Sequence, residues 1–285
     1  MKNRITIKNS VKIISSDKIN YVVKKKSRDL DNTYKYLLSR SFDYFPSLLS
    51  SHGDYYVYEY ISDIVEPKEQ KIIDMISLLS LLHSKTTFYK EVDVDYFKDI
   101  YEKVNNEIDD TYNYYNELIN NIDNIVYMSP SNYLIARNIS IIYSMINYSK
   151  YNIDKWYDMV KDKRKVRMVN IHNNLKLEHY LKSNNKSYFI SWDNSRIDNP
   201  IYDIISLYEN NYLDFDFSEL FKIYLSKYPL HDDEIILLFT YLSIPKKIKY
   251  TKTEYLNVLN IRTYLDYIYK TSDLLSEYGK KEETK

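Results

Sequence analysis

The first sixty residues alternate short β-branched and aromatic runs with polar turns. The runs RITI, VKIIS, INYVVKK and YYVYEYI are separated by turn-forming segments such as KNS and SHGD. This pattern is typical of antiparallel strands. Between the third and fourth runs, DLDNTYKYLLSRSF has helical spacing, with Asp31 or Asn32 as the candidate N-cap. Its inward side would carry Tyr36, Leu37 and Phe42. The pattern predicts three strands, a helix and further strand.

Helical spacing dominates from Pro67 onwards. Apolar residues recur every three or four positions through residues 72–82, and again over a longer stretch through residues 97–122. We expect a further helix to begin at Ser129 and a shorter one to cover residues 153–160. The apolar runs VRMVNI and SYFIS then predict a small hairpin, after which helical spacing returns.

The length of the chain suits two lobes of unequal size. Its 285 residues lie at the upper limit of what a single hydrophobic core reaches, about 250 to 300 residues. We therefore predict an α+β fold, with a small antiparallel β-rich lobe over residues 1–63. Residues 64–285 would form a large, mainly helical lobe.

Composition restricts the chemistry and the partners. The chain has no cysteine, which excludes disulfides, thiolate nucleophiles and cysteine-held zinc, and we expect a cytoplasmic protein. Lysine plus arginine (40) equal aspartate plus glutamate (40), so binding of nucleic acid or anionic lipid would need a local basic patch. No segment has the apolar run of a signal peptide or membrane helix. We expect neither a nucleic-acid nor a membrane partner.

The 34 tyrosines do not change this picture. Tyrosine, asparagine, lysine and isoleucine are all abundant, and all four have AT-rich codons. This composition is typical of a protein encoded by an AT-rich bacterial genome.

Two segments in the second half carry the candidate chemistry. HNNLKLEH runs from His172 to His179, and FISWDNSRIDNPIYD runs from Phe189 to Asp203. Together they resemble the aminoglycoside phosphotransferase and choline kinase-like family, which includes spore-coat-associated kinase-like proteins. That family reads HGDLHxxN, then a hydrophobic strand ending in DWE or DxD, then DPxYD. The resemblance implies a two-lobed, protein-kinase-like fold.

At three motif positions, the chain departs from the residues that the resemblance leads us to expect. Asn174 stands where the family has its catalytic aspartate, and an amide cannot accept a proton from a hydroxyl. Loss of such a base commonly reduces the rate roughly 10²- to 10⁴-fold. His179 replaces the metal-binding asparagine, although Mg²⁺ prefers oxygen ligands. Ser191 replaces a metal-binding aspartate with a neutral hydroxyl.

Two charged residues keep the positions that the resemblance assigns to binding of metal and phosphate. Asp193 stands where the family often has a second acid, and Lys24 in YVVK aligns with the lysine that reaches the phosphates. The turn KNS offers no glycine to cradle a phosphate, and the helix that follows Lys24 offers no glutamate in its middle to orient this lysine.

The remaining charged and imidazole groups have simpler interpretations. His172, Asp198 and Asp203 belong to the frame of the motif, where we expect them to hold the loop together. A zinc site at His172 and His179 would lack the HExxH spacing. The basic run KDKRKVR, residues 161–167, could bind nucleic acid, but a solvated loop explains it more simply.

These substitutions favour a pseudokinase, which binds a protein partner or small ligand without transferring phosphate. In that case the chain is not an enzyme and needs no cofactor. A first alternative is an active ATP-dependent phosphotransferase for a small molecule, with Asp193 binding Mg²⁺ and Lys24 binding phosphate. A second alternative is a structural scaffold, for example of a spore coat or a mobile element.

Overall fold

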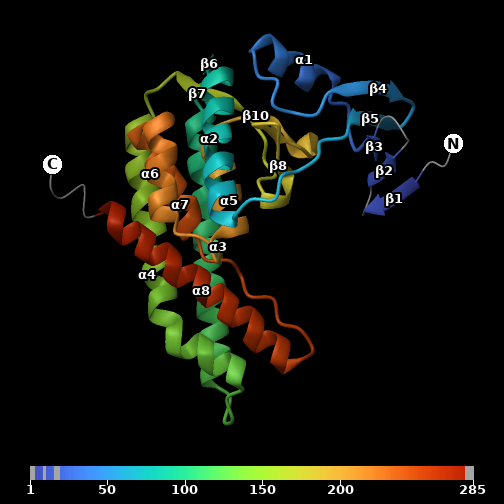
Figure 1. Cartoon of the computed structure of the whole chain (residues 1–285). Helices are drawn as coiled ribbons and strands as arrows, with labels where there is room; N and C mark the ends of the chain where they lie inside the picture. The colour runs from blue at the N-terminus through green and yellow to red at the C-terminus, as the bar shows by residue number, and fades with distance from the viewer. Residues whose placement is uncertain (1–3, 9–10, 16–19, 280–285) are drawn as a thin grey trace. The chain divides into compact units, whose positions relative to one another are not determined.

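The computed structural model describes residues 4–8, 11–15 and 20–279 (Figure 1). In chain order its elements are β1 (Arg4–Lys8), β2 (Val11–Ser15), β3 (Asn20–Lys25), α1 (Asp31–Ser39), β4 (Leu48–His52), β5 (Tyr55–Glu59), α2 (Lys68–Thr86), β6 (Phe88–Glu91), α3 (Tyr96–Asp123), α4 (Pro130–Val160), β7 (Lys165–Ile171), η1 (Leu177–His179), β8 (Tyr180–Ser183), β9 (Lys186–Phe189), η2 (Trp192–Asn194), β10 (Arg196–Asp198), α5 (Ile201–Asn211), α6 (Phe217–Lys227), α7 (Asp232–Ser243) and α8 (Glu254–Gly279). A small antiparallel sheet and a larger set of helices confirm the predicted α+β class.

The chain divides into two compact units that each combine distant segments. The first, here called the sheet unit, comprises Met1–Phe88, Met168–Asn210 and Lys222–Tyr228. The second, here called the helical unit, comprises Tyr89–Arg167, Asn211–Phe221 and Pro229–Lys285. Because each unit is discontinuous, this division does not test a lobe boundary at a single point, and the boundary after residue 63 stays a prediction.

The sheet unit is built on a five-stranded antiparallel sheet in the order β1-β2-β3-β5-β4. Lys24 lies in the central strand β3, where it faces Val11 of β2 and Tyr56 of β5. The strands and helix predicted from the opening pattern are therefore present. Residues 9 and 10 of the predicted KNS turn lie outside the described residues.

The predicted cap of α1 was wrong. The N-cap is Leu30, and Asp31 already lies in the first turn of the helix. The Leu30 amide donates to the hydroxyl of Tyr56 (2.8 Å), and the Asp31 amide donates to Asp29 Oδ1 (2.9 Å). Asp29 thus accepts at the start of α1, two positions before the predicted cap, because an aspartate readily accepts from an amide two positions on.

Two short antiparallel pairs follow in the sheet unit. β7 pairs with β10, placing Val169 opposite Asp198, and β8 pairs with β9. The predicted hairpin of VRMVNI with SYFIS was therefore wrong. β8 and β9 are joined by Asn184 and Asn185, both with positive φ (48° and 62°). Two such residues give the twist that a two-residue hairpin turn requires, and asparagine tolerates it.

The helical unit is organised around α4. In this unit α3 and α4 form a hairpin, and α7 and α8 both pack against α4 (Figure 1). The periodic apolar residues of α3 are buried, including Val104, Ile108 and Ile122. α4 is one continuous helix where two were predicted, since no proline or glycine interrupts it after Pro130. Within the described residues, no helix is both long and apolar enough to cross a membrane.

The basic run over residues 161–167 ends inside β7 and is only partly solvated, which corrects the expected loop. Within the helical unit, the Arg167 side chain is only 8% exposed. It donates from Nε to Glu234 Oε1 (2.9 Å), from Nη2 to Glu234 Oε2 and from Nη1 to the carbonyl of Pro229 (3.0 Å). Such a buried pair is satisfied internally, so Arg167 is not available to an external phosphate.

Candidate functional site

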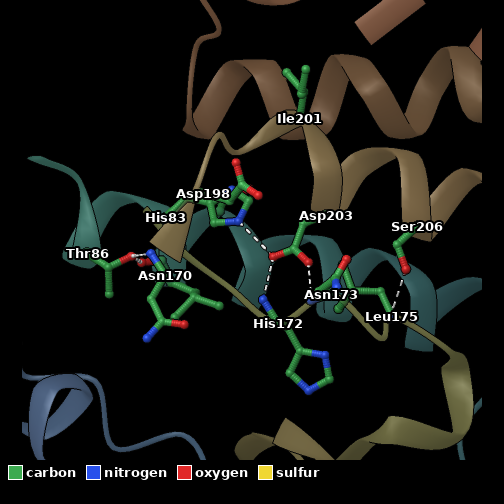
Figure 2. A network of polar contacts seen from close by, with 12 residues as sticks. His83, Thr86, Asn170, His172, Asn173, Leu175, Asp198, Ile201, Asp203 and Ser206 are labelled. Carbon is green, nitrogen blue, oxygen red and sulfur yellow. Dashed lines mark hydrogen bonds and ion pairs between the residues drawn. The ribbon is translucent and has the colours of Figure 1, made fainter. Parts of the chain in front are cut away.

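One buried carboxylate fixes the loop that follows β7 in the sheet unit (Figure 2). Asp203, in the first turn of α5, accepts the His172 amide at Oδ2 (2.8 Å) and the Asn173 amide at Oδ1 (2.6 Å). One turn further along α5, Ser206 Oγ accepts the Leu175 amide (3.3 Å). The start of α5 therefore sets the backbone path of the loop that carries Asn174.

The analysis of the sequence missed His83, which completes this network. The ring lies fully buried on α2, with Nε2 3.0 Å from Asp203 Oδ2 and Nδ1 2.7 Å from the hydroxyl of Tyr224. In a neutral ring, Nε2 donates to the carboxylate and Nδ1 accepts from the tyrosine. The available signal was a single imidazole in the apolar stripe LLSLLHSK, a position where a polar ring needs buried partners.

His172 supports the loop from its other side. Its buried ring donates from Nε2 to the carbonyl of Ile190 (2.8 Å) and packs against Trp192 and Phe189, with ring centroids 4.8 and 5.2 Å away. Burial lowers the pKa of His172 to about 4, because a charged imidazolium would lose its hydration. The ring is therefore neutral near pH 7 and serves as a packing and hydrogen-bonding group.

Two turns of the site adopt the left-handed backbone conformation without glycine. Asn173, at the glycine position of the resembling motif, has φ 56°, and Ser191 has φ 66°. Asparagine visits this region more readily than most residues, whereas a serine there is strained by about 1 kcal/mol. The loop geometry is thus retained despite the scarcity of glycine.

Lys24 and Asp193 lie in direct contact. Lys24 Nζ donates to Asp193 Oδ2, and Ser27 Oγ donates to Asp193 Oδ1 (2.6 Å). The two charged side chains are only 20% and 22% exposed. Burial raises the pKa of Asp193, but the hydrogen bonds from Lys24 and Ser27 outweigh it, so this pKa lies below its usual range. Both oxygens of the retained acid are occupied.

The other motif positions do not converge on this pair. His179 Nδ1 lies 2.7 Å from the backbone carbonyl of Asn174 and donates to it. His179 and Asn174 therefore lie together, whereas the side-chain partners of Asp193 are Lys24 and Ser27. Asp198 lies outside the Asp203 network, since its carboxylate accepts from Arg196 Nε and from the Asn199 amide (both 2.8 Å).

The residues as placed do not fit a Mg²⁺-bound nucleotide. The described part of the chain contains no group of three or more histidines, aspartates or glutamates arranged to hold a metal ion. Mg²⁺ is bound in such sites through carboxylates and substrate phosphates. Here the charge of Asp193 is offset by Lys24, and Asn174 and Ser191 are uncharged.

We predict that Asp203→Asn lowers the free energy of unfolding by about 3 kcal/mol. The new amide group would face a backbone N–H and leave it buried without an acceptor. Urea unfolding measures the change. Asp198→Asn is the matched control, because the same substitution at this partly exposed carboxylate should cost less than about 1 kcal/mol. Equal losses in the two variants would contradict the anchoring role of Asp203.

The low pKa of Asp193 predicts a pH dependence of stability. A carboxylate with a depressed folded-state pKa stabilises the fold above its unfolded pKa, about 3.9. That stabilisation is lost as the pH falls from this value through the folded-state pKa. Unfolding measured by urea between pH 2 and 7 should therefore show a steeper loss below about pH 4 in the native chain than in Asp193→Asn. Identical profiles would show that the pair does not form.

Comparison with known proteins identifies the fold of the chain. The chain matches no protein-family model and no curated protein sequence. Among solved structures, it is similar to an aminoglycoside phosphotransferase from Alicyclobacillus acidocaldarius, with 12% identity, TM-score 0.75 and coverage of 99% of this chain and 93% of the other. It is also similar to a spectinomycin phosphotransferase in complex with ADP and spectinomycin, with 11% identity, TM-score 0.53 and coverage of 95% and 93%. The chain therefore has the fold of the aminoglycoside phosphotransferases, as its motifs predicted.

Proposed function

We propose that this chain is a pseudokinase, which uses a phosphotransferase fold to bind a protein partner or small ligand without transferring phosphate. One observation carries the proposal: Lys24 and Ser27 occupy both oxygens of Asp193. In this arrangement the cation suited to a phosphate and the carboxylate suited to a metal satisfy each other.

The electrostatics of the pair oppose binding of Mg²⁺ and ATP. A nucleotide could use Lys24 only after displacing Asp193, which would leave a partly buried carboxylate without its cation. Removing one partner of a buried pair costs on the order of a few kcal/mol. A metal ion on Asp193 would have to replace the charge of Lys24 to offset this cost. Ser191 and His179 add no negative charge that would help to hold such an ion.

The base position supports the same proposal. The Asn174 side chain can orient a hydroxyl but cannot take its proton. In phosphoryl transfer, the protein acts mainly by positioning groups and neutralising charge. Weak metal binding and a missing base together would remove most of that assistance.

The contact between Lys24 and Asp193 also gives some support to the second candidate, an active phosphotransferase. The two groups that it requires, Lys24 and Asp193, come together from distant parts of the sequence. If ATP and Mg²⁺ separated them, one could bind phosphate and the other metal. Spectinomycin phosphotransferase has this fold and was solved with ADP.

Thermal unfolding with ATP and Mg²⁺ distinguishes the two candidates. A ligand at about 100 times its Kd stabilises a protein by about 2.7 kcal/mol, which raises the midpoint by several degrees in a chain of this size. We expect the midpoint to be the same with millimolar ATP, Mg²⁺, both or neither. We also expect no phosphate transfer to a panel of aminoglycosides and small alcohols.

Two variants make this test decisive. Asp193→Ala frees Lys24 but removes the one carboxylate that could hold a metal, so this variant should still show no Mg²⁺-dependent response to ATP. The triple variant Asn174→Asp, His179→Asn, Ser191→Asp restores the family pattern and reports whether the assay detects nucleotide binding in this fold. A Mg²⁺-dependent rise in the midpoint of the native chain, together with turnover that Asp193→Ala abolishes, would overturn the proposal in favour of the phosphotransferase.

A further inference from the structure

The turn between α3 and α4 exposes a run of large apolar side chains. In the sequence Ile125-Val126-Tyr127-Met128, all four residues are exposed, and Val126 and Tyr127 reach 89% and 90%. The turn forms the free end of the α3–α4 hairpin in Figure 1. Nothing in the core of the helical unit requires these residues, so their apolarity calls for a separate explanation.

The first turns of α8 expose a second apolar group. Tyr255, Leu256 and Leu259 are exposed, whereas Asn257 and Ile261 on the other side of the helix are buried. The helix therefore packs through one face and presents an apolar strip on the opposite one.

Hydrogen bonds bring these two groups to the same end of the helical unit. Glu254, the first residue of α8, accepts from the amide and hydroxyl of Ser131 (2.7 and 3.0 Å) in the first turn of α4. The hydroxyl of Tyr250 donates to Asn132 Oδ1 (3.0 Å). We call residues 125–128 together with the exposed α8 strip the apolar tip.

A lysine-rich loop lies beside the apolar tip. The segment PKKIKYTKT, residues 245–253, runs along α3, where the hydroxyls of Tyr114 and Tyr115 donate to its carbonyls at Ile248 and Lys246 (both 2.7 Å). Its four lysines are all exposed: Lys246, Lys247, Lys249 and Lys252. These bonds hold the start of the loop along α3, and the bonds of Tyr250 and Glu254 to the first turn of α4 hold its end beside the tip.

Positive charge exceeds negative charge at this end of the helical unit, although α3 places two exposed acids, Asp110 and Glu117, within about one turn of Tyr114. The acids in residues 122–137 and 244–262 are Asp123 and Glu254, and the Glu254 carboxylate is already held by Ser131. Lys247, Lys249 and Lys252 form no ion pair within the described part of the chain. A locally basic end thus exists in a chain whose net charge is zero.

We propose that the apolar tip and the lysine loop form a docking site for the surface of an anionic lipid membrane. Exposed aliphatic and tyrosine side chains insert into the headgroup region, and flanking lysines bind acidic headgroups. A nucleic-acid site would use the lysines but leave the isoleucine, valine and leucine side chains in water. The expectation of no membrane partner rested on the balanced charge of the whole chain, which averages out this local patch, and on the lack of a long apolar run, which binding to a membrane surface does not require.

Sedimentation of the full chain with vesicles tests this site. We expect binding to vesicles of equal parts phosphatidylcholine and phosphatidylglycerol, weakening as salt is added, and little binding to phosphatidylcholine alone. Changing Lys247, Lys249 and Lys252 to Gln should weaken binding about 5-fold per lysine and roughly 100-fold together. Val126→Ser with Tyr127→Ser should weaken it by at least about tenfold, because less apolar surface is buried.

Matched controls separate docking from general surface effects. Val65→Ser with Val94→Ser changes two exposed valines elsewhere, and Lys35, Lys68 and Lys85 to Gln removes three exposed lysines. Both controls should bind anionic vesicles as the native chain does. Equal binding to neutral and anionic vesicles, binding to neither, or equal losses in the controls would overturn the proposal. Concentration-dependent self-association that Val126→Ser and Tyr127→Ser abolish, without vesicle binding, would instead assign the tip to a second copy of the chain.

Discussion

The Asp203 carboxylate is the interaction on which the site depends. It accepts two successive loop amides and faces the buried His83 ring, so three separate segments of the sheet unit meet at one charge. A buried carboxylate is tolerated only when it is fully hydrogen-bonded, and each partner is therefore constrained by the others. This explains how the frame holds the loop independently of the side chain at Asn174.

Two of the three motif positions that the resemblance marks as substituted lie outside this hydrogen-bonded frame, whereas the third, His179, donates to the Asn174 carbonyl within the loop. Asn174 and Ser191 lie on the loops that Asp203 and His172 hold in place, but neither side chain supports the backbone. The side chain at either position can therefore differ in charge without loss of the loop. The Lys24–Asp193 pair links β3 to η2 within the sheet unit.

The sequence predicted the features that depend on local patterns. Periodicity located α2 and α3, and the motif spacing led to the fold. Features set by long-range contacts were missed or wrong. β7 pairs with β10 and not with the run SYFIS, and His83 acquires its role only through Asp203 and Tyr224. The roles of Asn174, His179 and Ser191 stay predictions. The apolar tip was hidden because its parts lie more than a hundred residues apart.

The central claim is that Lys24 and Asp193 close the site by binding each other. A crystal structure of the chain grown with Mg²⁺ and a non-hydrolysable ATP analogue tests it most directly. We predict that Lys24 Nζ remains hydrogen-bonded to Asp193, with neither phosphate nor metal on this pair. A structure with phosphate on Lys24 and a metal ion on Asp193 would contradict the claim.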